Sequence, residues 1–241
     1  MSHCQNCHRR LDGPYCAACG QRDIDLERPV WSLIRDVVKE TFELDGRAAV
    51  TLKTLFRHPG MLTSEFLAGR RQTFTPPLRL YLAISISFFV LFAWFAQSGA
   101  LLDPGQDPGF DAAVQARFLS EDLPRLMFIM LPVFALLLKI VYLRRLYFDH
   151  MIFSLHLHSA AYVILAVILS LENLSDRHTT FLISQFALFV CFLAYFLVAV
   201  RRVYQSGWLT SVLKSAIVLF GYTLVVSVVI ENTSKFRIIA D

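Results

Sequence analysis

Residues 80–97, LYLAISISFFVLFAWFAQ, decide the fold, because 18 consecutive positions carry no charged side chain and together reach the length of a transmembrane helix. Four further apolar segments follow, at residues 126–143, 151–171, 180–200 and 209–230. Hydrophobic residues make up 56% of the chain and charged residues 17%, against about 45–50% and about 25% in soluble domains. The sequence therefore predicts an all-α polytopic membrane protein with five transmembrane helices.

The five spans occupy residues 80–230 and leave three shorter parts outside them. Residues 1–22 form a cysteine-rich unit, residues 23–79 a cytoplasmic juxtamembrane segment, and residues 231–241 a short outer tail. Within the second part, the apolar residues of PVWSLIRDVVKETFEL, residues 29–44, recur at spacings of three and four, which predicts an amphipathic helix. Its apolar face either packs on the membrane region or a partner subunit, or lies among lipid headgroups with Trp31 as anchor.

Arginines beside the spans predict the orientation of the chain in the membrane. They precede the first span and separate the second from the third and the fourth from the fifth: Arg70, Arg71, Arg79, Arg144, Arg145, Arg201 and Arg202. With five spans, all three sites fall on one side, and the other connections are rich in Asp and Glu. Because Lys and Arg are retained in the cytoplasm, the N-terminus is expected inside and the tail outside. The polar start MSHCQNCHRR, which has no apolar signal core, agrees with this orientation.

The net charge of +4 does not indicate a nucleic-acid binder. Of the 23 Lys and Arg residues, 12 precede residue 80, but that stretch also holds 9 of the 19 acidic residues and contains no dense basic run. We expect no nucleic acid among the partners of this protein.

The strongest chemical signal is the pattern C-x2-C-x8-C-x2-C, formed by Cys4, Cys7, Cys16 and Cys19. Each two-residue gap lets two thiolates converge on one ion, and four thiolates form the closed tetrahedral site that suits structural Zn²⁺. Iron in a rubredoxin-like site is the alternative. The string CQNCH also fits covalent haem attachment, but the cytoplasmic location and the second cysteine pair argue against it. We expect a small zinc ribbon whose metal is structural.

Three histidines accompany the third span: His150 at its boundary, and His156 and His158 inside it. At about 100° per residue, His150 and His158 lie roughly 80° apart, whereas His156 is nearly opposite His158, so no single helix face gathers all three. They are interpreted as neutral rings hydrogen-bonded to neighbouring helices, as a proton relay or substrate contact, or as a metal or haem site. No set of catalytic residues is found in the sequence.

Residues 51–85, TLKTLFRHPGMLTSEFLAGRRQTFTPPLRLYLAIS, carry a family resemblance. With the double C-x2-C and the histidine-bearing third span, this segment resembles the bacterial membrane proteins grouped as the domain of unknown function 3667 family. The matching features are Pro59, Gly60, Leu67, Gly69, Arg70, Arg71, Phe74 and Pro76, while Phe66 departs from the tyrosine common at its position. The resemblance implies a bacterial inner-membrane protein and brings no activity with it.

The same segment has a local physical interpretation. Thr63 is expected to cap a helix over residues 64–68, and Gly69 to end it in the left-handed conformation. Arg70 and Arg71 then reach the membrane surface. Either they retain the N-terminus inside and contact lipid headgroups, or they bind an anionic ligand or substrate.

These features favour a non-enzymatic scaffold or assembly factor, whose zinc ribbon docks a cytoplasmic partner or arranges a homo-oligomer in the bilayer. Two alternatives stay open. One is a transporter or channel with His156 and His158 on its pathway, and the other is a lipid-modifying enzyme whose Arg70 and Arg71 hold a phosphate.

Overall fold

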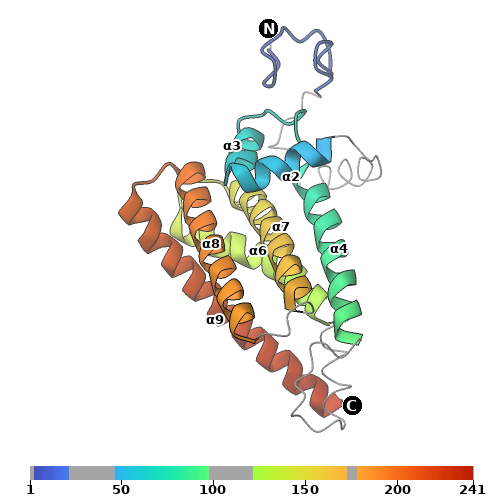
Figure 1. The fold of residues 1–241 in the computed structure, drawn as a ribbon. Coiled ribbons are helices and arrows are strands. Elements are labelled where there is room, and N and C mark those ends of the chain that lie inside the picture. The colour runs from blue at the N-terminus through green and yellow to red at the C-terminus, as the bar shows by residue number, and fades with distance from the viewer. Residues whose placement is uncertain (1–2, 22–46, 98–121, 173–177, 241) are drawn as a thin grey trace.

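The computed structural model describes residues 3–21, 47–97, 122–172 and 178–240, and these residues are helical apart from turns, short irregular segments and isolated bridges such as that between His3 and Arg10. The described helices are α2 (Arg47–Arg57), α3 (Met61–Leu67), α4 (Pro77–Gln97), α6 (Leu123–Val141), α7 (Tyr147–Glu172), α8 (His178–Tyr204) and α9 (Trp208–Ala240). The predicted all-α fold is confirmed (Figure 1). The amphipathic helix predicted for residues 29–44 lies outside the described residues.

Five helices are long and apolar enough to cross a membrane, as predicted. Their spans are Pro77–Phe95, Leu123–Val141, Tyr147–Leu171, Ile183–Tyr204 and Trp208–Thr233. Two of these helices begin with a proline in the first turn: Pro77 opens α4, and Pro124 follows the first residue of α6. Proline is tolerated there because the N–H that it lacks would have no hydrogen-bond partner in the first turn of a helix. The last helix continues to Ala240, through residues that the sequence assigns to a tail.

The central helix of the bundle is α7, which packs against α4, α6 and α8. In an apolar 18-residue window of its span 56% of the residues are buried, against 28% in the windows of α4 and α6, 17% in that of α8 and 11% in that of α9. Small residues let the neighbours approach closely, since Ser154, Ser159 and Ala160 are completely buried. Helix α9 packs on α6 and α8 and leaves most of its surface for lipid.

The short helices α2 and α3 lie across the end of the bundle at which α4, α7 and α9 begin (Figure 1). We call residues 47–76, which comprise these helices and the turn that follows, the cap. Gly60 has φ +76°, and a Cβ there would lie 2.7 Å from the carbonyl oxygen of Ala199, so its lack of a side chain brings α3 against α8. Arg202 adds a hydrogen bond of 2.8 Å to the carbonyl oxygen of Pro59.

The prediction for α3 was wrong at its start and right at its end. The helix begins at Met61, after Gly60, so Thr63 lies inside the helix instead of capping it. Its hydroxyl is buried against α7, a tertiary contact that the local capping pattern does not reveal. Gly69 does end the helix with φ +83°: its N–H bonds to Phe66 O, and the N–H of Arg70 bonds to Glu65 O.

Candidate metal centre and its junction with the cap

The four N-terminal cysteines form one cluster whose sulfur atoms all lie within 4.8 Å of one another. Cys4 Sγ is 3.6 Å from Cys19 Sγ, and Cys7 Sγ is 3.5 Å from Cys16 Sγ. Four sulfurs placed tetrahedrally at about 2.3 Å from an ion are about 3.8 Å apart, close to these separations. The cysteines therefore lie close enough to bind one metal ion.

Two copies of one backbone turn build this cluster. The carbonyl of Cys4 accepts a hydrogen bond from His8 N–H, and that of Cys16 accepts one from Gly20 N–H, both at 2.8 Å. The residue four positions after the first cysteine is left-handed in both copies, with φ 60° at His8 and 70° at Gly20. His8 is the histidine of the string CQNCH, which also fits haem attachment. It thus occupies the left-handed position of the first turn, which glycine occupies in the second.

Backbone amides of the second turn favour the thiolate forms that a metal requires. Hydrogen bonds from the N–H groups of Cys19 and Ala18 lower the pKa of Cys16 to about 6. The N–H of Gln21 likewise lowers the pKa of Cys19. Since metal binding releases protons from the ligands, amides that stabilise thiolates also assist binding.

Gln21 joins the cysteine unit, residues 3–21, to the cap. Its side-chain Nε2 donates to Gly69 O at 2.6 Å, and its Oε1 accepts from the N–H of Arg71 at 3.1 Å. The side chain is buried, and its hydrogen bond to Gly69 O is shielded from water. A Cβ at Gly69 would lie 1.9 Å from Gln5 Oε1, which shows how closely the unit approaches this turn.

The two arginines of the turn are engaged within the protein. Arg70 forms a bidentate ion pair with Glu65, which lowers the pKa of Glu65 and raises that of Arg70. The guanidinium of Arg71 lies 5.1 Å from the centre of the Phe66 ring, and burial lowers its pKa. Their predicted contact with headgroups or anions stays a prediction.

The three α7 histidines lie against three different elements. His156 Nδ1 is 3.0 Å from Thr63 Oγ1 in the cap, and His150 Nδ1 is 2.7 Å from the Tyr204 hydroxyl of α8. His158 bonds toward α9 through Nε2, 3.0 Å from the Tyr222 hydroxyl. The three rings are therefore separated, and His156 is the one that reaches the cap.

The hydrogen bonds of His158 define its tautomer. Nδ1 lies 2.8 Å from the carbonyl oxygen of Ser154, which can only accept, so Nδ1 carries the proton. Nε2 then accepts from the hydroxyl of Tyr222. No sequence pattern around Tyr222 identifies this lone tyrosine in an apolar segment as the partner of His158. Likewise, no pattern around Gln21 predicts its contacts.

A cavity of about 10 Å³, roughly the room of one water molecule, lies between the cap and α7. It is lined by Leu62, Phe66, Arg70, Arg71, Phe74, Thr75, Pro77 and His156. This is the place where predicted site residues from distant parts of the sequence meet.

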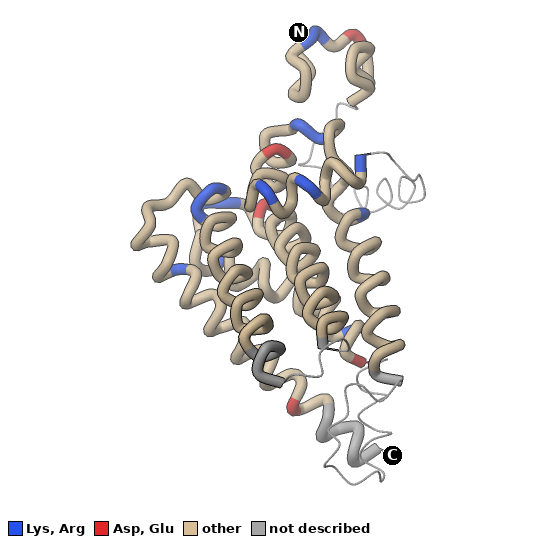
Figure 2. The backbone as a smooth tube through the Cα atoms, in the orientation of Figure 1, with Lys and Arg blue, Asp and Glu red and all other residues tan. Residues whose placement is uncertain are grey.

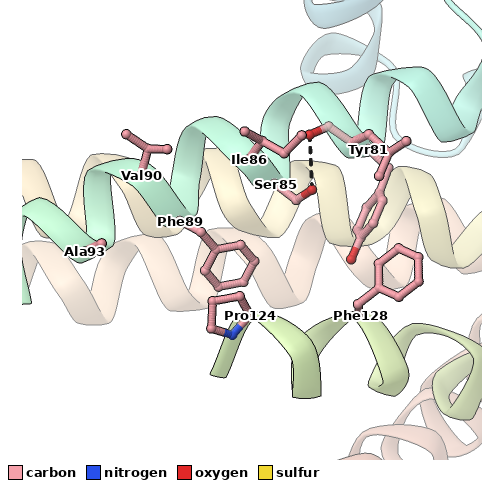
Figure 3. A pocket seen from close by; sticks show the side chains of 9 residues that line it. Tyr81, Ser85, Ile86, Phe89, Val90, Ala93, Pro124 and Phe128 are labelled. Carbon is pink, nitrogen blue, oxygen red and sulfur yellow. Dashed lines mark hydrogen bonds between the residues drawn. The ribbon is translucent and has the colours of Figure 1, made fainter. Parts of the chain in front are cut away.

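A groove of about 440 Å³ lies between α4 and α6. Figure 3 shows Phe89 and Pro124 facing each other across it, and the Tyr81 and Phe128 rings side by side. The Ser85 hydroxyl in this groove donates to Leu82 O of its own helix. The cysteines, histidines and arginines predicted as site residues do not line the groove, so the cap junction is the stronger candidate site.

Residues 45–89 match a family described as "Protein of unknown function (DUF3667)". This match confirms the predicted family resemblance. No curated protein and no solved structure matches the chain. The matched segment spans α2, α3 and the first half of α4, and it contains seven of the eight residues that line the small cavity. The part of this sequence that matches is thus the cap and the beginning of the helix that enters the bundle from it.

Proposed function

We propose that this protein is a non-enzymatic membrane scaffold that docks a cytoplasmic protein partner through its cysteine unit and cap. The observation that carries the proposal is the connection made by Gln21, which fixes the unit on the Gly69–Arg71 turn. A metal unit held on a rigid base offers a partner one defined surface, and the five spans anchor that surface at the membrane.

Zinc is the metal we assign to the cysteine cluster. Four thiolates in a tetrahedral arrangement are the ligand set of structural zinc sites, and the reducing cytoplasm keeps thiols available. With four protein ligands no coordination position is left for a substrate, which supports a structural role for the ion.

The charge distribution supports a cytoplasmic cap in a bacterial inner membrane. Figure 2 shows Lys and Arg of the bundle concentrated at the cap end, where the connection after α6 carries Arg144 and Arg145 and the last turn of α8 carries Arg201 and Arg202. Retention of basic residues in the cytoplasm then places the cap and the cysteine unit inside.

The test compares the wild-type protein with the double variant Cys16→Ser, Cys19→Ser. Both are extracted in a mild detergent, and the mass of the assembly is measured by native electrophoresis together with zinc content. We expect a higher-mass assembly in the wild type and its loss in the variant, with membrane insertion unchanged. Cys191→Ser, an exposed α8 cysteine outside the cluster, is the matched control and should keep both zinc and assembly.

A second variant separates the metal from its attachment. Gln21→Ala keeps all four ligands but removes both hydrogen bonds to the cap, so zinc should remain at one ion per chain while the assembly weakens. An assembly of unchanged mass in the double cysteine variant would contradict the scaffold proposal.

A further inference from the structure

Three cations gather where α6 ends and α9 begins, on the seam between these helices. Lys139 Nζ donates to the carbonyl oxygens of Leu143 and Arg145, at 2.7 and 2.6 Å. Lys214 Nζ, seven positions into α9, donates to Val141 O at 3.0 Å. Both ammonium groups thus converge on the short turn that connects α6 to α7.

No carboxylate neutralises this cluster among the residues that the structure describes. Arg145 Nη2 bonds to a backbone carbonyl as well, that of Val203 at 3.4 Å. Asp149, the acid nearest in sequence, forms no ion pair with any of the three cations within the described part of the chain. Backbone carbonyls carry only partial charges, so the full positive charge of the cluster remains largely uncompensated.

One buried hydroxyl group beside the cluster, that of Ser215, has no hydrogen-bond partner among the described residues. Ser215 follows Lys214 on α9. The ammonium of Lys214 lies 4.2 Å from the ring centre of Tyr142, and the Tyr142 hydroxyl interacts with the side chain of Ser206. Unpaired buried polar groups are costly, so a bound group with several acceptor oxygens would stabilise this region.

The surface beside the cations is apolar. On α6 Ile140 is 60% exposed, and on α9 Leu213 and Ile217 are 56% and 60% exposed. These side chains belong to helices that are long and apolar enough to span a membrane. An amphiphile with an anionic head and apolar tails fits both parts of this surface.

We propose that Lys139, Arg145 and Lys214 bind the phosphate of an anionic phospholipid whose acyl chains lie along the α6–α9 seam. Basic pockets between transmembrane helices on the cytoplasmic side bind anionic headgroups in this way, and long Lys side chains extend from within a span to the headgroup level. The binding is independent of the cysteine unit and of the docking role.

The test measures the melting temperature of the purified full chain in a nonionic detergent with added lipid. Dioleoylphosphatidylglycerol is compared with dioleoylphosphatidylcholine, and inorganic phosphate alone forms a third arm. We expect the anionic lipid to raise the melting temperature by several degrees more than the zwitterionic lipid. The double variant Lys139→Gln, Lys214→Gln should lose this difference.

Lys53→Gln, Arg57→Gln on α2 is the matched control, because it removes the same charge from exposed positions at the same end of the molecule. It should keep the full difference, as should the conservative variant Lys139→Arg, Lys214→Arg. Should the double Gln variant fail to fold, Lys214→Gln leaves Lys139 bonded to the carbonyls of Leu143 and Arg145 and must still weaken the response.

Three results would overturn the proposal. An equal rise in melting temperature with both lipids would exclude charge recognition. An unchanged lipid response in the Lys139→Gln, Lys214→Gln variant, or a reduction equal to that in the control variant, would exclude this site. An equal rise with inorganic phosphate alone would assign the cluster to a free anion in place of a lipid.

Discussion

The cap and the outer bundle differ in what holds them in place. The cap is tied down by directed polar contacts between residues far apart in sequence: Gln21 with Gly69, Thr63 with His156, and Arg202 with Pro59. By contrast, only 11% of the 18-residue window of the α9 span is buried, and Ile217 and Phe220 of this helix are exposed for lipid. The cap should therefore respond sharply to single substitutions, and the bundle periphery weakly.

The largest expected effect is the loss of the cysteine unit when its metal ligands are removed. In Cys16→Ser, Cys19→Ser we expect the bound metal to be lost and residues 3–21 to unfold, because so small a unit has too little core to fold without its ion. Metal analysis and amide hydrogen exchange measure both changes. Exchange within the five spans should remain slow, and fast exchange there would show that the unit and the bundle fold together.

Replacing Gly60 or Gly207 by Ala adds one carbon atom to the cap or to the bundle periphery, so the two substitutions compare these regions. Gly60→Ala places a Cβ 2.7 Å from Ala199 O at φ +76°, and the left-handed backbone alone costs about 1–2 kcal/mol. Gly207, before α9, has open space around it. We expect a clear fall in melting temperature for Gly60→Ala and almost none for Gly207→Ala. Equal falls would show that the close approach of α3 to α8 contributes nothing specific.

The sequence was sufficient where the signal is local. Apolar runs identify the five spans, the cysteine spacing identifies the cluster, and Gly69 identifies the end of α3. It was insufficient where a side chain finds its partner across the fold. Thr63 has the residue type of a helix cap but bonds to His156, 93 positions away, and nothing beside Gln21 in the chain indicates its contact with Gly69.

Two substitutions, each of which removes a hydrogen bond to an α7 histidine, sharpen the comparison further. Thr63→Val removes the hydroxyl that bonds to buried His156 Nδ1 while the ring keeps its hydrogen bond to the backbone of Ile152, so the expected cost is about 0.5–1.5 kcal/mol. Tyr222→Phe removes the partner of His158 inside the span, where such bonds average about 0.6 kcal/mol. Chemical denaturation in micelles measures both, and Thr54→Val, whose hydroxyl donates within α2, is the control. A larger loss for Tyr222→Phe would reverse the ranking of the two regions.

The smallest expected effect concerns the ion pair of Glu65 and Arg70 at the cap surface. The hydrogen bonds from Arg70 lower the pKa of Glu65 below its ordinary value of 4.5. The ionised carboxylate therefore stabilises the folded state fully above that value, and the contribution disappears as the pH falls through the lowered pKa. Because both side chains are partly exposed, at 22% and 38%, the contribution should stay below about 1 kcal/mol.

Glu65→Gln tests this ion pair through the pH dependence of melting. At pH 7 the variant should melt slightly below the wild type, and the two curves should converge as the pH falls well below 4.5. Asp12→Asn removes the more exposed ion pair with Arg10 in the cysteine unit. It should change neither the melting temperature at pH 7 nor its dependence on pH. A constant offset at every pH would mean that Glu65 contributes through packing and not through its charge.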